Sequence, residues 1–236
     1  MALRTGWTGL ELLSSPDEPL HVGLDRAARI RARDTLGSGV TPLSINSYVH
    51  VGHPQHSDAE VVEAIRAEAV LARDVGATAV RVFPGADGTR VIARRLKAAA
   101  QALPPGIEIW IETHDTHSTG RAVAHILDKA ADARVRAVWD IAHPVHQGEP
   151  WQETLVALQP HLAHVQIKDE FAAGTPPLPL GDGTVPVEAV LNGLSAEHYP
   201  GWVSLEWERK WFPEAAPLEE VLLAAGTWLR ERVRPN

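Results

Sequence analysis

The stretch "GIEIWIETHDTHSTG" (106–120) decides the fold class, because it joins a strand to polar residues placed where that strand ends. Ile107, Ile109 and Ile111 alternate with other residues, which is the two-residue period of a β-strand. The polar residues after Ile111 have two interpretations. They form a solvated loop in which Ser118 caps the next helix, or they form a metal or acid–base site at a strand terminus.

Strand-like runs recur along the whole chain, with segments of helical period between them. The runs are 8–13, 42–49, 78–84, 106–113, 136–142, 162–168 and 201–207, and the helical segments are 58–75, 88–102, 118–132, 151–159, 186–195 and 217–233. Strands that alternate with helices predict a parallel sheet of βαβ units. Seven units in 236 residues match the roughly 30 residues of one such unit.

Two architectures fit this alternation, an open doubly wound sheet and a (β/α) TIM barrel. No glycine-rich phosphate loop follows an early strand, so the barrel is favoured, as a single domain over 1–236. A complete TIM barrel has eight strands and seven are predicted, so the first is missing or vestigial. Either "MALRTGW" (1–7) supplies it, or the barrel is open between its first and last strands, or a partner chain covers the gap.

The composition of the chain argues against several classes of function. A formal net charge of −8 and a pI near 5.8 argue against a nucleic-acid partner. The absence of cysteine excludes a disulfide scaffold and a thiolate nucleophile. No apolar run is long enough for a membrane span, and the N-terminal residues do not resemble a signal peptide, so we expect a cytoplasmic enzyme.

The last four predicted strands each end in a side chain that offers an oxygen atom. These residues are Glu112, Asp140, Gln166 and Glu206. All four fall on the inward face by strand parity, and the carboxyl ends of barrel strands carry the active site, so we expect them to meet at one height.

Three converging carboxylates repel one another unless a cation lies between them, which favours a divalent metal. Hard oxygen ligands indicate Mn²⁺ or Mg²⁺, with Co²⁺ or Zn²⁺ as options if an imidazole joins. His114 and His143 are the nearby imidazoles, and each is a candidate substrate hydrogen-bonder, base or occasional ligand.

Lys168 ends the sixth predicted strand and is a candidate substrate-binding residue. The alternative is a structural ion pair with Asp169 or Glu170.

Arg81 and His164 complete the candidate substrate-binding set, because both face inward by parity. For Arg81 the alternative is a structural ion pair with Glu108 or Glu11. His164 shares the face of Gln166 one layer deeper, so its alternative is a hydrogen-bonded core histidine.

Five motifs in order, "IETH", "WDIAH", "HVQIKD", "LGDGTVP" and "GWVSLEWE", resemble the xylose isomerase-like sugar isomerase/epimerase family. The resemblance covers nearly the whole chain and starts at what would be the family's second strand. It implies that Glu112, Asp140, Gln166 and Glu206 bind the metal and that Glu112 and Glu206 are the acid–base pair. Many relatives have His where Gln166 stands, a difference that bears on which metal is bound.

The chemistry agrees with this implication, since removing a proton α to a carbonyl needs a base, an opposing acid–base group and a cation. We therefore predict a metal-dependent isomerase or epimerase of a small ketose or hydroxy-ketone. The alternatives are a dehydratase of the inosose or 3-dehydroshikimate type, with His114 as base and His143 protonating the leaving group, and a non-catalytic barrel subunit. The expected partners are a sugar substrate and either a second copy of the chain or a partner subunit at the open edge.

Overall fold

The computed structural model describes residues 2–37, 39–86 and 88–232. The last residue of the predicted 217–233 helix and both ends of the predicted 1–236 domain lie outside these residues. The strands are β1 (Gly9–Leu13), β2 (Thr41–Gly52), β3 (Ala79–Gly85), β4 (Glu108–Glu112), β5 (Val135–Asp140), β6 (Leu162–Ile167) and β7 (Trp202–Leu205). The helices are α1 (Ala2–Thr5), α2 (Arg26–Leu36), α3 (Asp58–Val75), α4 (Thr89–Gln101), α5 (Gly120–Ala130), α6 (Ala142–His146), α7 (Trp151–Leu158), α8 (Val187–Ala196) and α9 (Leu218–Arg232). Each predicted strand corresponds to an observed one.

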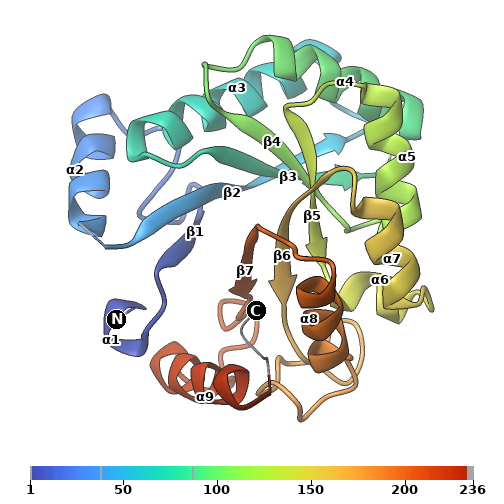
Figure 1. Cartoon of the computed structure of the whole chain (residues 1–236). Helices are drawn as coiled ribbons and strands as arrows, with labels where there is room; N and C mark the ends of the chain where they lie inside the picture. The colour runs from blue at the N-terminus through green and yellow to red at the C-terminus, as the bar shows by residue number, and fades with distance from the viewer. Residues whose placement is uncertain (1, 38, 87, 233–236) are drawn as a thin grey trace.

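The strands form one parallel sheet in the order β1-β2-β3-β4-β5-β6-β7, and the sheet curls into a nearly closed TIM barrel with helices around it (Figure 1). The prediction of a TIM barrel is confirmed. Among the described residues β1 and β7 share no ladder, so the barrel is open between its first and last strands. The vestigial-strand option is wrong for residues 2–5, because these form α1, which packs against α9.

Local sequence sets the helix ends. Ser57 and Glu60 form a capping box at the start of α3, and Gly76 ends that helix in the left-handed region at φ 87°. Helix α5 begins after Thr119, whose side chain accepts from the Ala122 amide, so the prediction of Ser118 as N-cap is wrong by one residue. Helix α2 was not predicted; none of its residues is buried, and only part of one face, including Ala32, packs against the core.

The core lies between the sheet and the helices, where Ile45, Ile109 and Trp139 are fully buried against helix residues. The inward face is polar at the carboxyl ends of the strands, as parity predicts. No described helix is long and apolar enough to cross a membrane.

Strand register places the four oxygen-bearing residues near the carboxyl ends of neighbouring strands. Asp140 pairs with Gln166 across β5 and β6. Glu112 pairs with Val138, two residues before Asp140, and Gln166 pairs with Ser204, two residues before Glu206. Barrel strands are tilted, so residues two positions apart in register on neighbouring strands can still approach one another.

The loop after β6 is held by the carboxylate of Asp169, which accepts from the amides of Gly181, Gly183 and Val185 at 2.8–3.1 Å. Gly181 has the positive φ (94°) expected of a turn glycine. Gly183 is needed for space instead, because a Cβ atom there would lie 2.1 Å from Asp169 Oδ1.

Candidate active site

A cavity of about 640 Å³ opens among the strand ends, a size suited to a small molecule. Seven of the nine predicted site residues line it: Arg81, Glu112, His114, His143, Gln166, Lys168 and Glu206. Asp140 and His164 are fully buried next to it. The structure therefore brings all nine to one end of the barrel.

The ammonium group of Lys168 lies among the acids of the site. Its Nζ atom is 2.8 Å from Asp140 Oδ2, 3.0 Å from Glu206 Oε2 and 3.6 Å from Glu208 Oε1. The alternative predicted for Lys168, an ion pair with Asp169 or Glu170, is wrong. Asp169 accepts hydrogen bonds from its own loop, and Glu170 pairs with a histidine of α6.

Burial and charge act against each other in this group. Burial raises the pKa of Glu206 to about 8, because the opposing attraction of Lys168 is smaller than burial and the repulsion from Asp140 adds to burial. Burial also tends to raise the pKa of Asp140, but Lys168 and His143 outweigh it and hold that pKa well below its usual range. The pKa values of these two neighbouring carboxyl groups therefore differ widely. This is expected where several buried acids share few positive charges.

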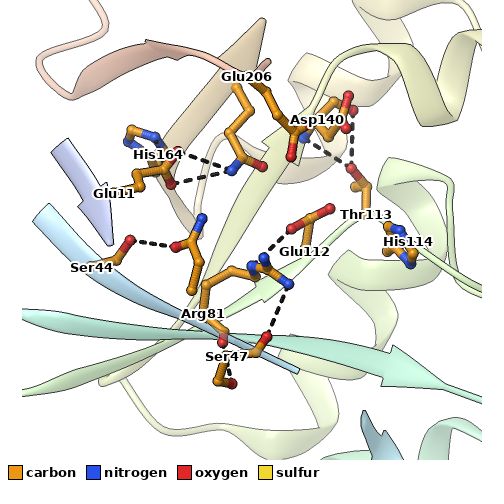
Figure 2. Close-up of polar contacts among 12 residues, drawn as sticks. Glu11, Ser44, Ser47, Arg81, Glu112, Thr113, His114, Asp140, His164 and Glu206 are labelled. Atoms are coloured by element: carbon orange, nitrogen blue, oxygen red, sulfur yellow. Dashed lines mark hydrogen bonds and ion pairs between the residues drawn. The ribbon is translucent and has the colours of Figure 1, made fainter. Parts of the chain in front are cut away.

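The Arg81 side chain extends from β3 to the end of β4, where its Nε atom lies 3.1 Å from Glu112 Oε2 (Figure 2). It also donates to the Ser47 carbonyl at 3.1 Å and lies 4.0 Å from the centre of the Phe83 ring. The structural alternative predicted for Arg81, an ion pair with Glu108 or Glu11, is therefore wrong, because the observed partner is Glu112.

The four predicted metal ligands share one property. Each has a buried side-chain oxygen atom: Glu112 Oε2, Asp140 Oδ2, Gln166 Oε1 and Glu206 Oε2. The three carboxylate oxygens pair with Arg81 or Lys168 at 2.8–3.1 Å, whereas Gln166 Oε1 accepts no hydrogen bond from the described residues. Three buried carboxylates and an amide oxygen without a donor are hard ligands, so the set fits a divalent cation that would share or replace the positive charge of these side chains.

The two histidines meet on the cavity wall. The His114 and His143 rings are 4.6 Å apart edge to face, and His143 Nε2 is 3.2 Å from Asp140 Oδ2. Ligand atoms of Glu112, His114 and His143 all lie within 4.8 Å of one another, close enough to share one ion. Glu112 thus belongs both to the predicted oxygen set and to an imidazole set.

Asp115, which the sequence left without a role, links His114 to a second histidine. Its Oδ1 atom is 2.9 Å from His114 Nδ1 and its Oδ2 atom is 3.1 Å from His50 Nδ1. Burial tends to raise the pKa of Asp115, but hydrogen bonds from both histidines outweigh it and hold the pKa far below its usual value. Its positive φ of 51° turns the carboxylate back toward β3, where the Gly85 amide donates to it.

Glu11 of β1 is the second residue that sequence reasoning missed. Gln166 Nε2 donates to both of its oxygens at 3.0 and 3.2 Å, and Ser204 Oγ donates at 2.7 Å. His164 Nε2 lies 3.2 Å from Glu11 and 2.9 Å from Ser204, and Trp110 stacks on its ring. His164 is thus fully buried and hydrogen-bonded, which agrees with its alternative as a core histidine.

Known proteins share this architecture. A family model described as xylose isomerase-like TIM barrel matches residues 1–232. The probable 3-DHS dehydratase AsbF from Bacillus anthracis has a TM-score of 0.79 at 17% identity, over 98% of this chain and 91% of that chain. The IOLI protein with a binding zinc atom has a TM-score of 0.78 at 17% identity, over 98% and 89%.

One curated relative resembles the sequence itself. The protein named "Putative hydroxypyruvate isomerase" from Streptomyces coelicolor is 27% identical over 158 residues, which are 58% of this chain and 55% of that protein. The matched region spans just over half the length of this relative.

Proposed function

Because the chain belongs to the xylose isomerase-like TIM barrel family, we propose that it is a divalent-metal-dependent isomerase or epimerase of a small ketose or hydroxy-ketone. One observation carries the proposal: the ends of four neighbouring strands bring together three buried carboxylate oxygens and Gln166 Oε1, a buried amide oxygen that accepts no hydrogen bond from the described residues. Glu112, Asp140, Gln166 and Glu206 would hold Mn²⁺ or Mg²⁺, and structural neighbours solved with zinc or magnesium support a bound cation in this fold.

When bound, the cation would draw electrons from a substrate carbonyl and favour loss of the α-proton. Glu112 and Glu206 reach the cavity from strands three apart, so one would remove a proton and the other would return it from the opposite side. Lys168 and Arg81 supply cationic donors on the cavity wall for substrate hydroxyl groups.

The test combines metal binding with proton exchange. Mn²⁺ titration should show one stoichiometric site and a raised melting temperature, since a ligand of the folded state stabilises it. Hydroxypyruvate and small ketoses incubated in D₂O should then gain deuterium at the α-carbon, and Glu112→Gln should lower that rate by roughly 10²-fold or more. A chain that neither binds Mn²⁺ nor gains stability from it contradicts the proposal.

A second candidate is a metal-dependent dehydratase. The adjacent His114 and His143 rings favour it, because loss of a β-hydroxyl needs a base and a group that protonates the leaving oxygen. The fold shared with a probable dehydratase is compatible with this reaction. Formation of a conjugated enone, seen as new ultraviolet absorbance, distinguishes it from isomerisation.

A non-catalytic barrel subunit is the third candidate, and the open edge between β1 and β7 is the feature that motivates it. Size-exclusion mass and activity measured together decide the matter. A chain that binds Mn²⁺ but is inactive until a different protein is added would favour the subunit.

A further inference from the structure

We infer that Glu11 is a positioning residue that makes Gln166 present its oxygen, rather than its NH₂ group, to the cation site. The inference rests on the proposed metal site and concerns a residue on β1, the strand farthest along the sheet from the predicted ligands. It follows from two observations: Glu11 accepts hydrogen bonds from Gln166 and Ser204, and the buried Gln166 Oε1 atom accepts none.

The hydrogen bonds settle which end of the amide turns away. An ionised carboxylate has no proton to donate, so a neighbouring amide must offer it the NH₂ end. Gln166 Nε2 does so to both Glu11 oxygens, which leaves Oε1 at the other end of the planar amide, pointing away from Glu11. Gln166 Oε1 is buried and accepts no hydrogen bond, while Gln166 itself lines the cavity.

Other side chains hold the Glu11 carboxylate in place. Ser204 Oγ donates to Glu11 Oε2 at 2.7 Å, and His164 Nε2 lies 3.2 Å from Glu11 Oε1. With these groups on the same carboxylate, Glu11 has little freedom to turn away from the NH₂ end of Gln166.

The orientation matters because an amide ligates a hard cation only through its oxygen. An NH₂ group turned into the site would place partial positive charge against the ion. Partners that orient a ligand in this way typically change metal affinity by about 10–100-fold when they are removed.

A pair of exchanged side chains tests the inference. Glu11→Gln should weaken Mn²⁺ binding by about 10–100-fold, because the new amide no longer requires the NH₂ end of Gln166. Gln166→Glu should also weaken it, because two carboxylates would then face each other. In the Gln166→Glu background, however, Glu11→Gln should strengthen Mn²⁺ binding, since the amide at position 11 can donate to the carboxylate at position 166. Mn²⁺ dissociation constants from electron paramagnetic resonance measure all four proteins.

Glu108→Gln is the matched control, because Glu108 is a barrel-strand carboxylate that accepts from Trp110 and does not line the cavity. It should leave Mn²⁺ affinity unchanged. If Glu11→Gln weakens binding equally with Gln or Glu at position 166, Glu11 acts through its charge or through folding, and the inference is wrong.

A measurement without metal separates this inference from the proposed function. The side-chain NH₂ resonances of Gln166, assigned by their loss in Gln166→Glu, should exchange slowly with solvent and should exchange faster in Glu11→Gln. Fast exchange in the unaltered protein overturns the inference. Slow exchange without Mn²⁺ binding leaves the orientation intact and contradicts the proposed function alone.

Discussion

Lys168 Nζ lies 2.8 Å from Asp140 Oδ2, so a protein ammonium group already neutralises one of the proposed metal ligands. The same group lies 3.0 Å from Glu206 Oε2. An entering divalent cation must therefore share these oxygens with a buried positive charge or displace it.

Lys168→Met should tighten Mn²⁺ binding by about tenfold, because no buried ammonium then opposes the ion. Without metal, the same variant should melt at a lower temperature than the unaltered chain, since Asp140 loses its nearest cation. Calorimetric titration and melting curves with and without Mn²⁺ measure both effects. Equal or weaker binding by the variant would show that Lys168 and the ion do not compete.

Asp115→Asn should preserve the fold, because asparagine tolerates the positive φ of this position, but should lower activity by about tenfold. The physical reason is that the carboxylate holds a proton on His114 Nδ1 and leaves Nε2 to the cavity side. Imidazole ¹⁵N shifts should show one His114 tautomer in the unaltered chain and a mixture in the variant.

The control for this change is Asp128→Asn, which alters an exposed Asp–His pair, His161 Nε2 to Asp128 Oδ1 at 3.0 Å, away from the cavity. It should leave activity unchanged. If both variants lose activity alike, the position of Asp115 beside His114 is not the cause.

Glu68 on α3 should make stability depend on pH. Burial raises its pKa from 4.5 to about 7, with Ser14 and Arg29 opposing the shift more weakly. The folded chain therefore binds this proton more tightly than the unfolded chain. The resulting stability is fully present below pH 4.5 and is lost as the pH rises through 7.

Glu68→Gln removes that titration, so it should match the unaltered chain at pH 4 and be more stable at pH 8 by up to about 3 kcal/mol. Urea unfolding at the two pH values measures the difference. Glu63→Gln on the same helix is the control, because Glu63 is exposed and should produce no such gain at pH 8. A gain from Glu68→Gln that is equal at both pH values would contradict the assignment.

Gly183→Ala should lower stability by about 2 kcal/mol or more, because its Cβ atom would collide with Asp169 and open the loop that follows β6. For a chain of this size that corresponds to a fall of about 4–8 °C in melting temperature. Gly88→Ala is the comparison, since a Cβ atom there meets nothing within 4 Å. Similar losses in both variants would indicate a general effect of alanine rather than this collision.

The parts of the molecule that could be predicted from sequence are those governed by local periodicity. Alternation identified all seven strands and placed Glu112 and Gln166 on the inward face, and the Ser57 capping box marked the first residue of α3. Helix α2 was not predicted, and none of its residues is buried.

The ion-pair partners could not be predicted, because they depend on register between strands. The structural alternative predicted for Arg81 was an ion pair with Glu108 or Glu11, but the register between β3 and β4 brings it to Glu112 instead. The roles of Asp115 and Glu11 were hidden for a related reason. Each acts on a residue of another segment, His50 and Gln166, and no periodicity in a single sequence records such a contact.

The seam between the first and last strands has a consequence for how the molecule folds. Glu11 joins β1 to Gln166, 155 residues away, and to Ser204, 193 residues away. Contacts this distant in the chain close large loops and slow folding, so we expect them among the last to form. The ring of strands and the orientation of Gln166 would then be completed in the same late step. A chain synthesised only as far as β6 would contain Glu11 and Gln166 but would lack Ser204, the partner on the last strand, and Glu206, the last of the site acids.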